Sequence, residues 1–239
     1  MYSSFYTAAL GAAGQMERLG VVGNNLANIN NYGYKSKNAV FTDLLYYNLN
    51  NYNGDETTIQ AGTGIYMEKT DTDFSPSGFE NTERVYDFAI LEDGFFMLRN
   101  PVTNEITYTR NGRFSLSLRG DTFYLVNDAG HLVLDANRNP IRGIKDEYGE
   151  NDVENMPAIF DFAIKNGMQS VGDNEFVPVA KNGNPILQNE QPLQRSLEMS
   201  NVDMANELVR MIETQRAYTY ALKMVQTSDE VVQTVNSLR

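Results

Sequence analysis

The sequence predicts an α+β protein in which long N- and C-terminal helices pair as a coiled-coil layer, with a central, mainly antiparallel β domain. Two observations support this prediction: apolar residues recur every seven positions near both ends of the 239-residue chain, and short β-type runs fill the middle. A seven-residue apolar repeat is typical of a helix that buries one stripe against other helices. The two repeats consist of Phe5, Ala12, Leu19 and Leu26, and of Met204, Met211, Tyr218, Val225 and Val232.

The N-terminal segment, residues 1–35, should contain one amphipathic helix over about residues 3–30. Four glycines interrupt it, at Gly11, Gly14, Gly20 and Gly23. Each glycine costs about 1 kcal/mol relative to alanine in a helix. Either a neighbouring helix approaches closely at these positions, or the helix is frayed. An Asn-rich run over residues 24–31 should end the helix, because asparagine competes for backbone hydrogen bonds and tolerates left-handed backbone.

The central region divides into two expected parts. Residues 36–64 are predicted to be an extended linker that leads into a loop rich in Asn and Gly. Residues 65–195 are predicted to be the β-rich outer domain. Within that domain the acidic residues 145–157 are expected to form a surface loop.

The β prediction rests on short apolar runs separated by turn residues. Phe95–Leu98, Phe114–Leu118 and Phe123–Val126 are such runs, and Asp93-Gly94 and Asn111-Gly112 are such turns. A spacing of roughly 8–12 residues between turns favours antiparallel structure, as a sandwich or a partly closed barrel.

The C-terminal segment, residues 196–239, should be mostly one helix that begins at Ser200. Ser200 and Asp203 have the spacing of a capping box, in which a hydroxyl accepts an amide hydrogen bond at the start of the helix. Leu208 and Leu222 widen the apolar stripe. A helix of about 38 residues would be about 57 Å long, which one small domain cannot cover, so partner helices are needed.

Composition excludes several classes of function. The net charge is −12, and the segments 1–52 and 196–239 carry only +1 and −2, which leaves −11 for the residues between them. Such an acidic body argues against binding nucleic acid or anionic lipid, whereas near-neutral ends suit packing against further copies. The chain has no cysteine, and no segment approaches the roughly 20 apolar residues of a membrane span. The sequence also lacks the pattern of a cleaved secretory signal.

No arrangement of residues indicates catalysis. His131 is the only histidine, and its place between a turn glycine and a strand is typical of a surface residue. Asp71 and Asp73 are expected to be solvated charges, and Gly62-Thr-Gly64 lacks the lysine of a phosphate-binding loop. We therefore expect no enzyme activity, no cofactor, no metal site and no small-molecule substrate.

Three motifs carry a resemblance to a known family. The run from Asn24 to Lys35 resembles the N-terminal signature of bacterial flagellar rod and hook proteins, and Asp93–Phe96 with Tyr108–Phe114 resembles their central motif. Leu197–Asp203 with Met211–Tyr218 resembles their C-terminal motif. The residues that we assign to these signatures are Asn24, Asn25, Leu26, Asn28, Gly33, Lys35, Gly94, Phe95, Phe96, Arg110, Gly112, Ser200, Asn201, Gln215 and Arg216.

The resemblance implies a structural axial subunit of the flagellar basal body in the cell envelope. Such a subunit is exported through the flagellar type III apparatus without a cleaved signal, and polymerises helically beside other rod and hook subunits into the drive shaft. In the family the terminal helices form the inner layer of that shaft. The chain length and residues 214–218 are most similar to distal rod subunits.

The assembly interface is expected on the two apolar repeats and the residues that widen them. We assign to it Phe5, Ala12, Leu19, Leu26, Met204, Leu208, Met211, Tyr218, Leu222, Val225 and Val232. A proximal rod subunit or a hook subunit is the nearest alternative. A self-contained surface binding module would instead bury its terminal helices internally, and an enzyme would need convergent acid, base or metal groups.

Overall fold

The computed structural model describes residues 2–44, 46–48, 60–145 and 151–238, and the chain forms two compact units. The helical unit combines Met1–Ala27, Lys37–Asp71 and Asp203–Arg239. The β unit combines Asn28–Ser36 with Thr72–Val202. Each unit is therefore built from pieces that are distant in sequence.

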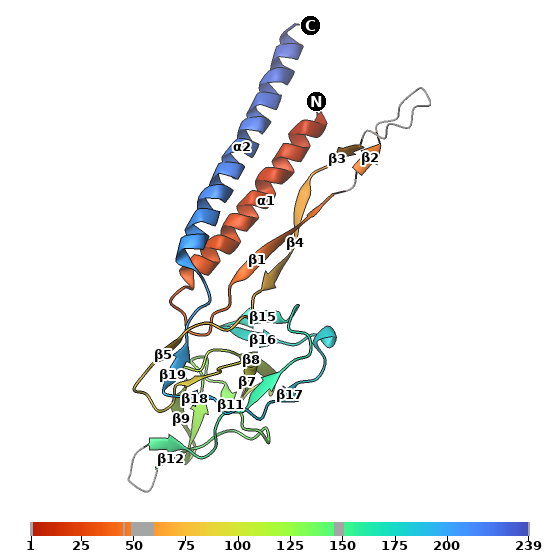
Figure 1. The fold of residues 1–239 in the computed structure, drawn as a ribbon. Coiled ribbons are helices and arrows are strands. Elements are labelled where there is room, and N and C mark those ends of the chain that lie inside the picture. Colours follow the sequence, from red (N-terminus) through yellow and green to blue (C-terminus); the bar gives the residue numbers. More distant parts are fainter. Residues whose placement is uncertain (1, 45, 49–59, 146–150, 239) are drawn as a thin grey trace. The chain divides into compact units, whose positions relative to one another are not determined.

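Two helices form most of the helical unit. Helix α1 (Tyr2–Ala27) and helix α2 (Met204–Ser237) pack against each other, and they run in opposite directions, so that both chain ends lie at the same end of the pair (Figure 1). Helix α1 ends three residues earlier than expected, and the Asn-rich run that follows forms turns.

The start of α2 differs from the sequence prediction. Asp203, not Ser200, is the N-cap: its backbone is extended, and its carboxylate accepts hydrogen bonds from the amides of Ala205 and Asn206. The Ser200 hydroxyl accepts instead from the Val202 amide at 3.3 Å. Because Ser196–Glu198 pairs as strand β19 with β5 (Phe79–Asn81), residues 196–202 belong to the β unit, and the helix cannot begin before them.

The segment expected to be a linker contains strands that pack beside the helices. Strand β1 (Lys37–Asp43) pairs with β4 (Ile65–Thr72), and β2 (Tyr46–Asn48) pairs with β3 (Gln60–Gly62). The expected loop between β2 and β3 lies largely outside the described residues.

The glycines of α1 have a different role from the expected one. A Cβ on Gly14 would lie 3.3 Å from the Phe41 ring and 3.8 Å from Ile65, so the close neighbour there is the β1–β4 ribbon, not a helix. A Cβ on Gly11, Gly20 or Gly23 would meet open space.

The β unit is mainly antiparallel, as predicted. Its largest sheet, of nine strands among the described residues, has the order β15-β16-β8-β7-β11-β10-β9, and β14 pairs with both β7 and β17. These strands are β7 (Phe95–Arg99), β8 (Ile106–Thr109), β9 (Ser115–Arg119), β10 (Thr122–Val126), β11 (Leu132–Val133), β14 (Ile159–Asp161), β15 (Gln169–Gly172), β16 (Glu175–Val177) and β17 (Ile186–Leu187). Smaller pairs join β6 (Phe88–Ala89) to β18 (Leu193–Gln194), and β12 (Gly143–Lys145) to β13 (Asn151–Val153).

Part of the acidic stretch expected as a surface loop is therefore a strand. Asp152 pairs with Ile144 in the β12–β13 ladder, and Val153 is buried in an apolar cluster. Residues 146–150 lie outside the described part of the chain.

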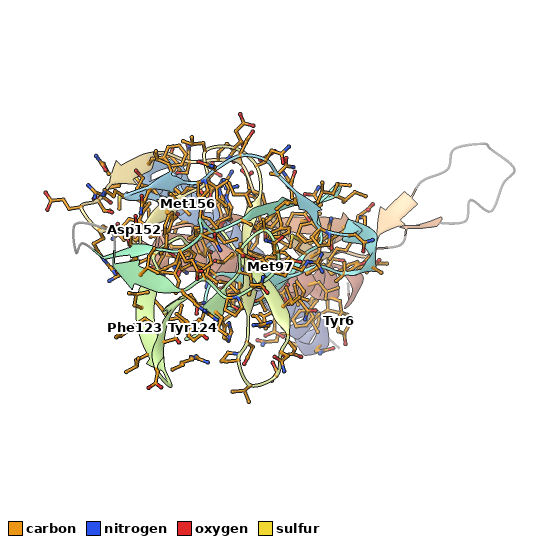
Figure 2. The ribbon with its side chains drawn as sticks, turned by 90° about the horizontal axis from the view of Figure 1, so that it is seen from below. Tyr6, Met97, Phe123, Tyr124, Asp152 and Met156 are labelled. Carbon is orange, nitrogen blue, oxygen red and sulfur yellow. The ribbon has the colours of Figure 1, made fainter. Side chains whose placement is uncertain are left out.

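Two apolar clusters occupy the two faces of the sheet. Successive side chains of a strand point to opposite faces, and along β7 the residues Phe95 and Met97 join one cluster while Phe96 and Leu98 join the other. Met97 is fully buried, whereas Phe123 on β10 is exposed (Figure 2). Strand β7 is thus covered on both sides, which explains its uninterrupted run of apolar residues.

Candidate assembly site

One stripe of α2 is shielded, and it follows the spacing of a helix–helix seam. Buried or half-buried positions recur at alternating steps of four and three residues over the whole helix. These positions are Glu207, Met211, Thr214, Tyr218, Ala221, Val225, Ser228 and Val232, and Ala217, beside Tyr218, is also half-buried. Helix α1 is the helix that packs on α2, so this stripe is the one that an intramolecular partner covers.

The predicted interface residues do not all lie on that stripe. Met211, Tyr218, Val225 and Val232 belong to it, and on α1 the repeat residues are buried (Ala12) or half-buried (Phe5, Leu19 and Leu26). Met204, Leu208 and Leu222 are instead exposed, at 53%, 43% and 37% of their surface. Leu208 and Leu222 each follow a shielded residue by one position, which turns them by about 100° around the helix. Met204 is the first residue of α2 and precedes the first shielded position, Glu207.

We call the part of α2 that α1 leaves uncovered the outer face. Its exposed apolar residues are Met204, Leu208, Val209, Ile212, Tyr220, Leu222, Met224, Val231 and Val235, with Leu238 at the C-cap, and they alternate with polar and charged residues over a broad arc of the helix. Helix α1 has exposed apolar residues of its own at Tyr6, Leu10 and Met16. Scattered exposed apolar residues are normal, but a series of this length along one helix makes the outer face the candidate for a contact with other chains.

A second feature is a buried ionic network within the β unit. The carboxylate of Glu198 accepts from Lys35 Nζ at 2.8 Å, from Arg110 Nε at 2.8 Å and from the Arg110 Nη2 at 3.0 Å. All three side chains are shielded from solvent almost completely. Burial lowers the pKa of the Lys35 ammonium from its ordinary value, and the charge of Glu198 opposes that shift.

Backbone groups complete the network. Lys35 Nζ also donates to the carbonyl of Ser75 at 2.6 Å, and Arg110 Nη1 donates to the carbonyls of Glu92 and Gly94, both at 2.8 Å. Each cation therefore has several acceptors, which is the condition under which buried charges are tolerated.

Two glycines and one asparagine side chain allow the three motifs to contact one another. Gly33 has φ +65°, its amide donates to the Glu198 carbonyl at 2.8 Å, and a Cβ there would overlap the backbone of Arg110. A Cβ on Gly112 would overlap the carbonyl oxygen of Phe88. The Asn201 side chain accepts from the Ser36 amide at 2.7 Å and donates to the Asp73 carbonyl at 2.8 Å.

Most of the signature residues stabilise the fold, in this network, in the apolar clusters or at the end of α1. Lys35, Arg110 and Glu198 come from the N-terminal, central and C-terminal motifs respectively, and Phe95 and Phe96 are core residues. In the helical unit the Asn25 side chain bonds both backbone groups of Lys37, at 2.8 and 2.9 Å. Because residues 28–36 are joined to Arg110 and Glu198, they belong to the β unit and not, as expected, to the N-terminal helical segment.

Four signature residues have a different environment. Gln215 and Arg216 are exposed on α2, Asn24 is exposed on α1, and Asn28 is half-buried and accepts from the Asn31 side chain at 2.7 Å. Sequence reasoning did not single out Glu198. Its signal was present, because it is the only acidic residue between residues 191 and 202 and two signature cations needed a counter-ion.

The other ionisable residues singled out in the sequence lie in separate contacts. His131 is half-buried, not superficial as expected, because its Nδ1 lies 2.8 Å from the Glu175 carboxylate. Asp71 pairs with Lys69 at 2.9 Å on the surface. Among the described residues, no group of three or more His, Asp or Glu side chains is placed to hold a metal ion, and neither helix has the length and apolarity to cross a membrane.

Comparisons with known proteins agree on one family. Residues 193–238 match the family model "Flagellar basal body rod FlgEFG protein C-terminal", and residues 89–172 match "Flagellar hook protein FlgE/F/G D1 domain". The flagellar basal-body rod protein FlgG of Buchnera aphidicola (subsp. Schizaphis graminum) is 31% identical over 264 residues, with all of both chains covered. The FlgG proteins of Bacillus subtilis and Borreliella burgdorferi are each 30% identical, over all of this chain and 100% and 99% of their own.

Proposed function

This chain belongs to the flagellar basal-body rod protein family, and we propose that it polymerises helically through its terminal helices to build the distal rod. It is a structural subunit of the bacterial flagellar basal body, and the similar proteins of Buchnera, Borreliella and Bacillus carry the name FlgG. The family is a structural one and not an enzyme family.

The outer face of α2 is the observation that carries the polymerisation proposal. Leu208, Ile212 and Leu222 are exposed large apolar residues beside the stripe of the helix that α1 already covers. Burying such side chains is favourable by about 25 cal/mol for each Å² of apolar surface removed from water. In a rod, the helix pairs of further copies of this chain would cover the outer face. A contact of this kind that does not close on itself generates a filament.

The shielded stripe supports a coiled-coil arrangement of α1 and α2 as the inner layer of the rod. Its alternating steps of four and three residues are those of knobs-into-holes packing. Two layers of contact then result, because the stripe holds the pair together within one subunit and the outer face joins subunits. Gln215 and Arg216, which are exposed and belong to the C-terminal signature, would lie in the contact between subunits.

Family membership implies assembly with other rod and hook subunits. We further propose that the chain reaches its place through the flagellar type III export apparatus. The distal position rests on the similarity to FlgG proteins along the whole chain, whereas a FlgF protein of Mesorhizobium japonicum is 28% identical over 99% of both chains.

The test is electron microscopy of basal bodies from a strain that lacks this gene. We expect rings with a shortened rod and no hook, and the length of the stub distinguishes the distal from the proximal part. A complete rod that ends without a hook would make the chain a hook component. Intact flagella would refute the axial role, and complementation with the natural gene controls for secondary mutations.

A further inference from the structure

The dipeptide Asn-Gly occurs three times in the described part of the β unit, and the fold gives each pair a different environment. In this dipeptide the backbone nitrogen of the glycine can attack the side-chain amide of the asparagine, because glycine has no Cβ to hinder the rotation that the attack requires. In a folded protein the reaction depends on whether the two groups can reach the reactive geometry. The pairs are Asn111-Gly112, Asn166-Gly167 and Asn182-Gly183, and a fourth, Asn53-Gly54, lies outside the described residues.

The side chain of Asn182 is held by three hydrogen bonds. Its Nδ2 donates to the carbonyls of Ile164 and Asn166, at 2.7 and 3.3 Å. Its Oδ1 accepts from the Val179 amide at 2.7 Å, and the residue is fully buried. Rotation of this amide toward Gly183 would leave buried polar groups without partners, which is costly. The fold therefore protects this pair.

The pair Asn111-Gly112 is protected by packing around its glycine. Asn111 Oδ1 accepts from the Arg113 amide at 3.0 Å. Gly112 is buried, and its carbonyl accepts from the Phe88 amide at 3.0 Å. A Cβ on Gly112 would overlap the Phe88 carbonyl oxygen, so the two backbones are in close contact. The backbone at this position has no room to rotate toward the asparagine side chain.

The pair Asn166-Gly167 has neither form of protection. Both residues are exposed, in the turn between β14 and β15. A Cβ on Gly167 would meet open space, and the φ of +89° at this position is one that residues with a Cβ rarely adopt. Within the described residues, no hydrogen bond holds the side chain of Asn166 or the amide of Gly167. The two reacting groups are therefore adjacent and free to rotate.

We propose that Asn166 is a modification site, at which the folded chain loses the side-chain amide without an enzyme. The Gly167 nitrogen forms a bond to Asn166 Cγ, the Cγ–Nδ2 bond breaks, and ammonia leaves with the proton of the Gly167 nitrogen. Water then opens the cyclic imide at one of its two carbonyls. Attack at the former side-chain carbonyl gives aspartate, and attack at the backbone carbonyl gives isoaspartate. The reaction consumes only water and needs no second copy, so the inference does not depend on the proposed rod function.

The product changes both the charge and the contacts of the turn. The new carboxylate is adjacent in sequence to Lys165, whose Nζ pairs with Asp93 at 2.7 Å and with Asp161 at 3.2 Å. Isoaspartate also routes the main chain through the former side chain, which displaces the Asn166 carbonyl that accepts from Asn182. A chain that contains isoaspartate should therefore unfold at a lower temperature than the variant Asn166→Asp, which adds the charge alone.

The test incubates the purified chain in mildly alkaline buffer, which favours attack by the glycine nitrogen. Each Asn-Gly peptide is then quantified by mass spectrometry after digestion. We expect residue 166 to convert about tenfold or more faster than residues 111 and 182, because each hydrogen bond that must break slows the reaction. Asn166→Gln, whose longer side chain cannot close the same ring, should abolish conversion at this position. In the urea-unfolded chain, which controls for local sequence, the three pairs should convert at similar rates.

Conversion of residue 111 or 182 as fast as residue 166 in the folded chain would overturn the inference. An unmodified residue 166, under conditions in which the unfolded chain converts, would overturn it as well. A difference that persists in urea would assign the order of rates to neighbouring residues in the sequence and not to the fold, against the proposal. The gene deletion tests the rod function separately, so failure of one leaves the other standing.

Discussion

Lys35 and Glu198 form an ion pair of 2.8 Å across 163 residues of sequence, and both side chains are fully shielded from solvent. With Arg110 they bind the first, central and last motifs of the chain to one another. A buried carboxylate between two cations is the centre of the cluster, because its loss leaves both cations without compensation.

We predict that Glu198→Gln destabilises the β unit more than Lys35→Met does. The glutamine leaves two buried cations unneutralised, whereas the methionine leaves Glu198 paired with Arg110. Removal of one partner of a buried pair costs about 3–5 kcal/mol, and we expect Glu198→Gln to reach or exceed this range. Urea unfolding of the purified chain measures it, with Glu154→Gln on the exposed surface as the control. A loss below that of Lys35→Met would contradict the central role of the carboxylate.

We predict that Gly33→Ala costs more stability than Gly120→Ala. Both glycines have nearly the same left-handed backbone, with φ +65° and +62°, so both substitutions incur the roughly 1–2 kcal/mol of that conformation. Only the Cβ at position 33 overlaps other backbone, that of Arg110 and Asn111, while the Cβ at position 120 meets open space. The difference between the stability losses of the two variants, measured by thermal unfolding, gives the steric contribution at position 33. Equal losses would mean that the contact at Gly33 relaxes freely.

We predict that Asp203→Ala weakens α2 and that Ser200→Ala has little effect on it. The Asp203 carboxylate caps two amides of the first turn, at 2.9 and 3.3 Å. Loss of such a cap costs about 0.5–2 kcal/mol. Circular dichroism followed over temperature measures the helix, and Asp203→Asn, which keeps a capping oxygen, should restore most of the loss. A larger loss for Ser200→Ala than for Asp203→Ala would mean that Ser200 caps the helix, as the sequence predicted.

We predict that Leu222→Asp and Val225→Asp differ in what they disrupt. Leu222 lies on the outer face, so its aspartate should abolish rods and motility while the purified monomer keeps its helix content and thermal midpoint. Val225 lies on the shielded stripe, so Val225→Asp should lower both the helix content and the thermal midpoint of the monomer. Gln226→Asp adds the same charge at an exposed polar position and controls for charge alone. Normal rods with Leu222→Asp would refute the outer face as an assembly surface.

The sequence predicted the helices and the antiparallel body well, because both depend on local periodicity. It could not divide the apolar residues of α2 between two surfaces, since Val225 and Leu222 are alike in type and differ only in their angle around the helix. Glu198, the only acidic residue between residues 191 and 202, was a signal that went unused, because local patterns do not show which distant segments meet in a buried ion pair. The boundary errors have the same origin: residues 28–36 and 196–202 join the β unit through contacts that no local pattern reveals.

Both units combine segments from near the two ends of the sequence, and this determines when each unit can complete its folding. The α1–α2 contact and the Glu198 network both join residues before position 36 to residues from position 198 onward, and contacts of such sequence separation form slowly. A chain that passes N-terminus first through a narrow conduit cannot complete either unit until residues 198–239 have emerged. Under the proposed export, this order of emergence would delay contacts between subunits until the chain has left the conduit.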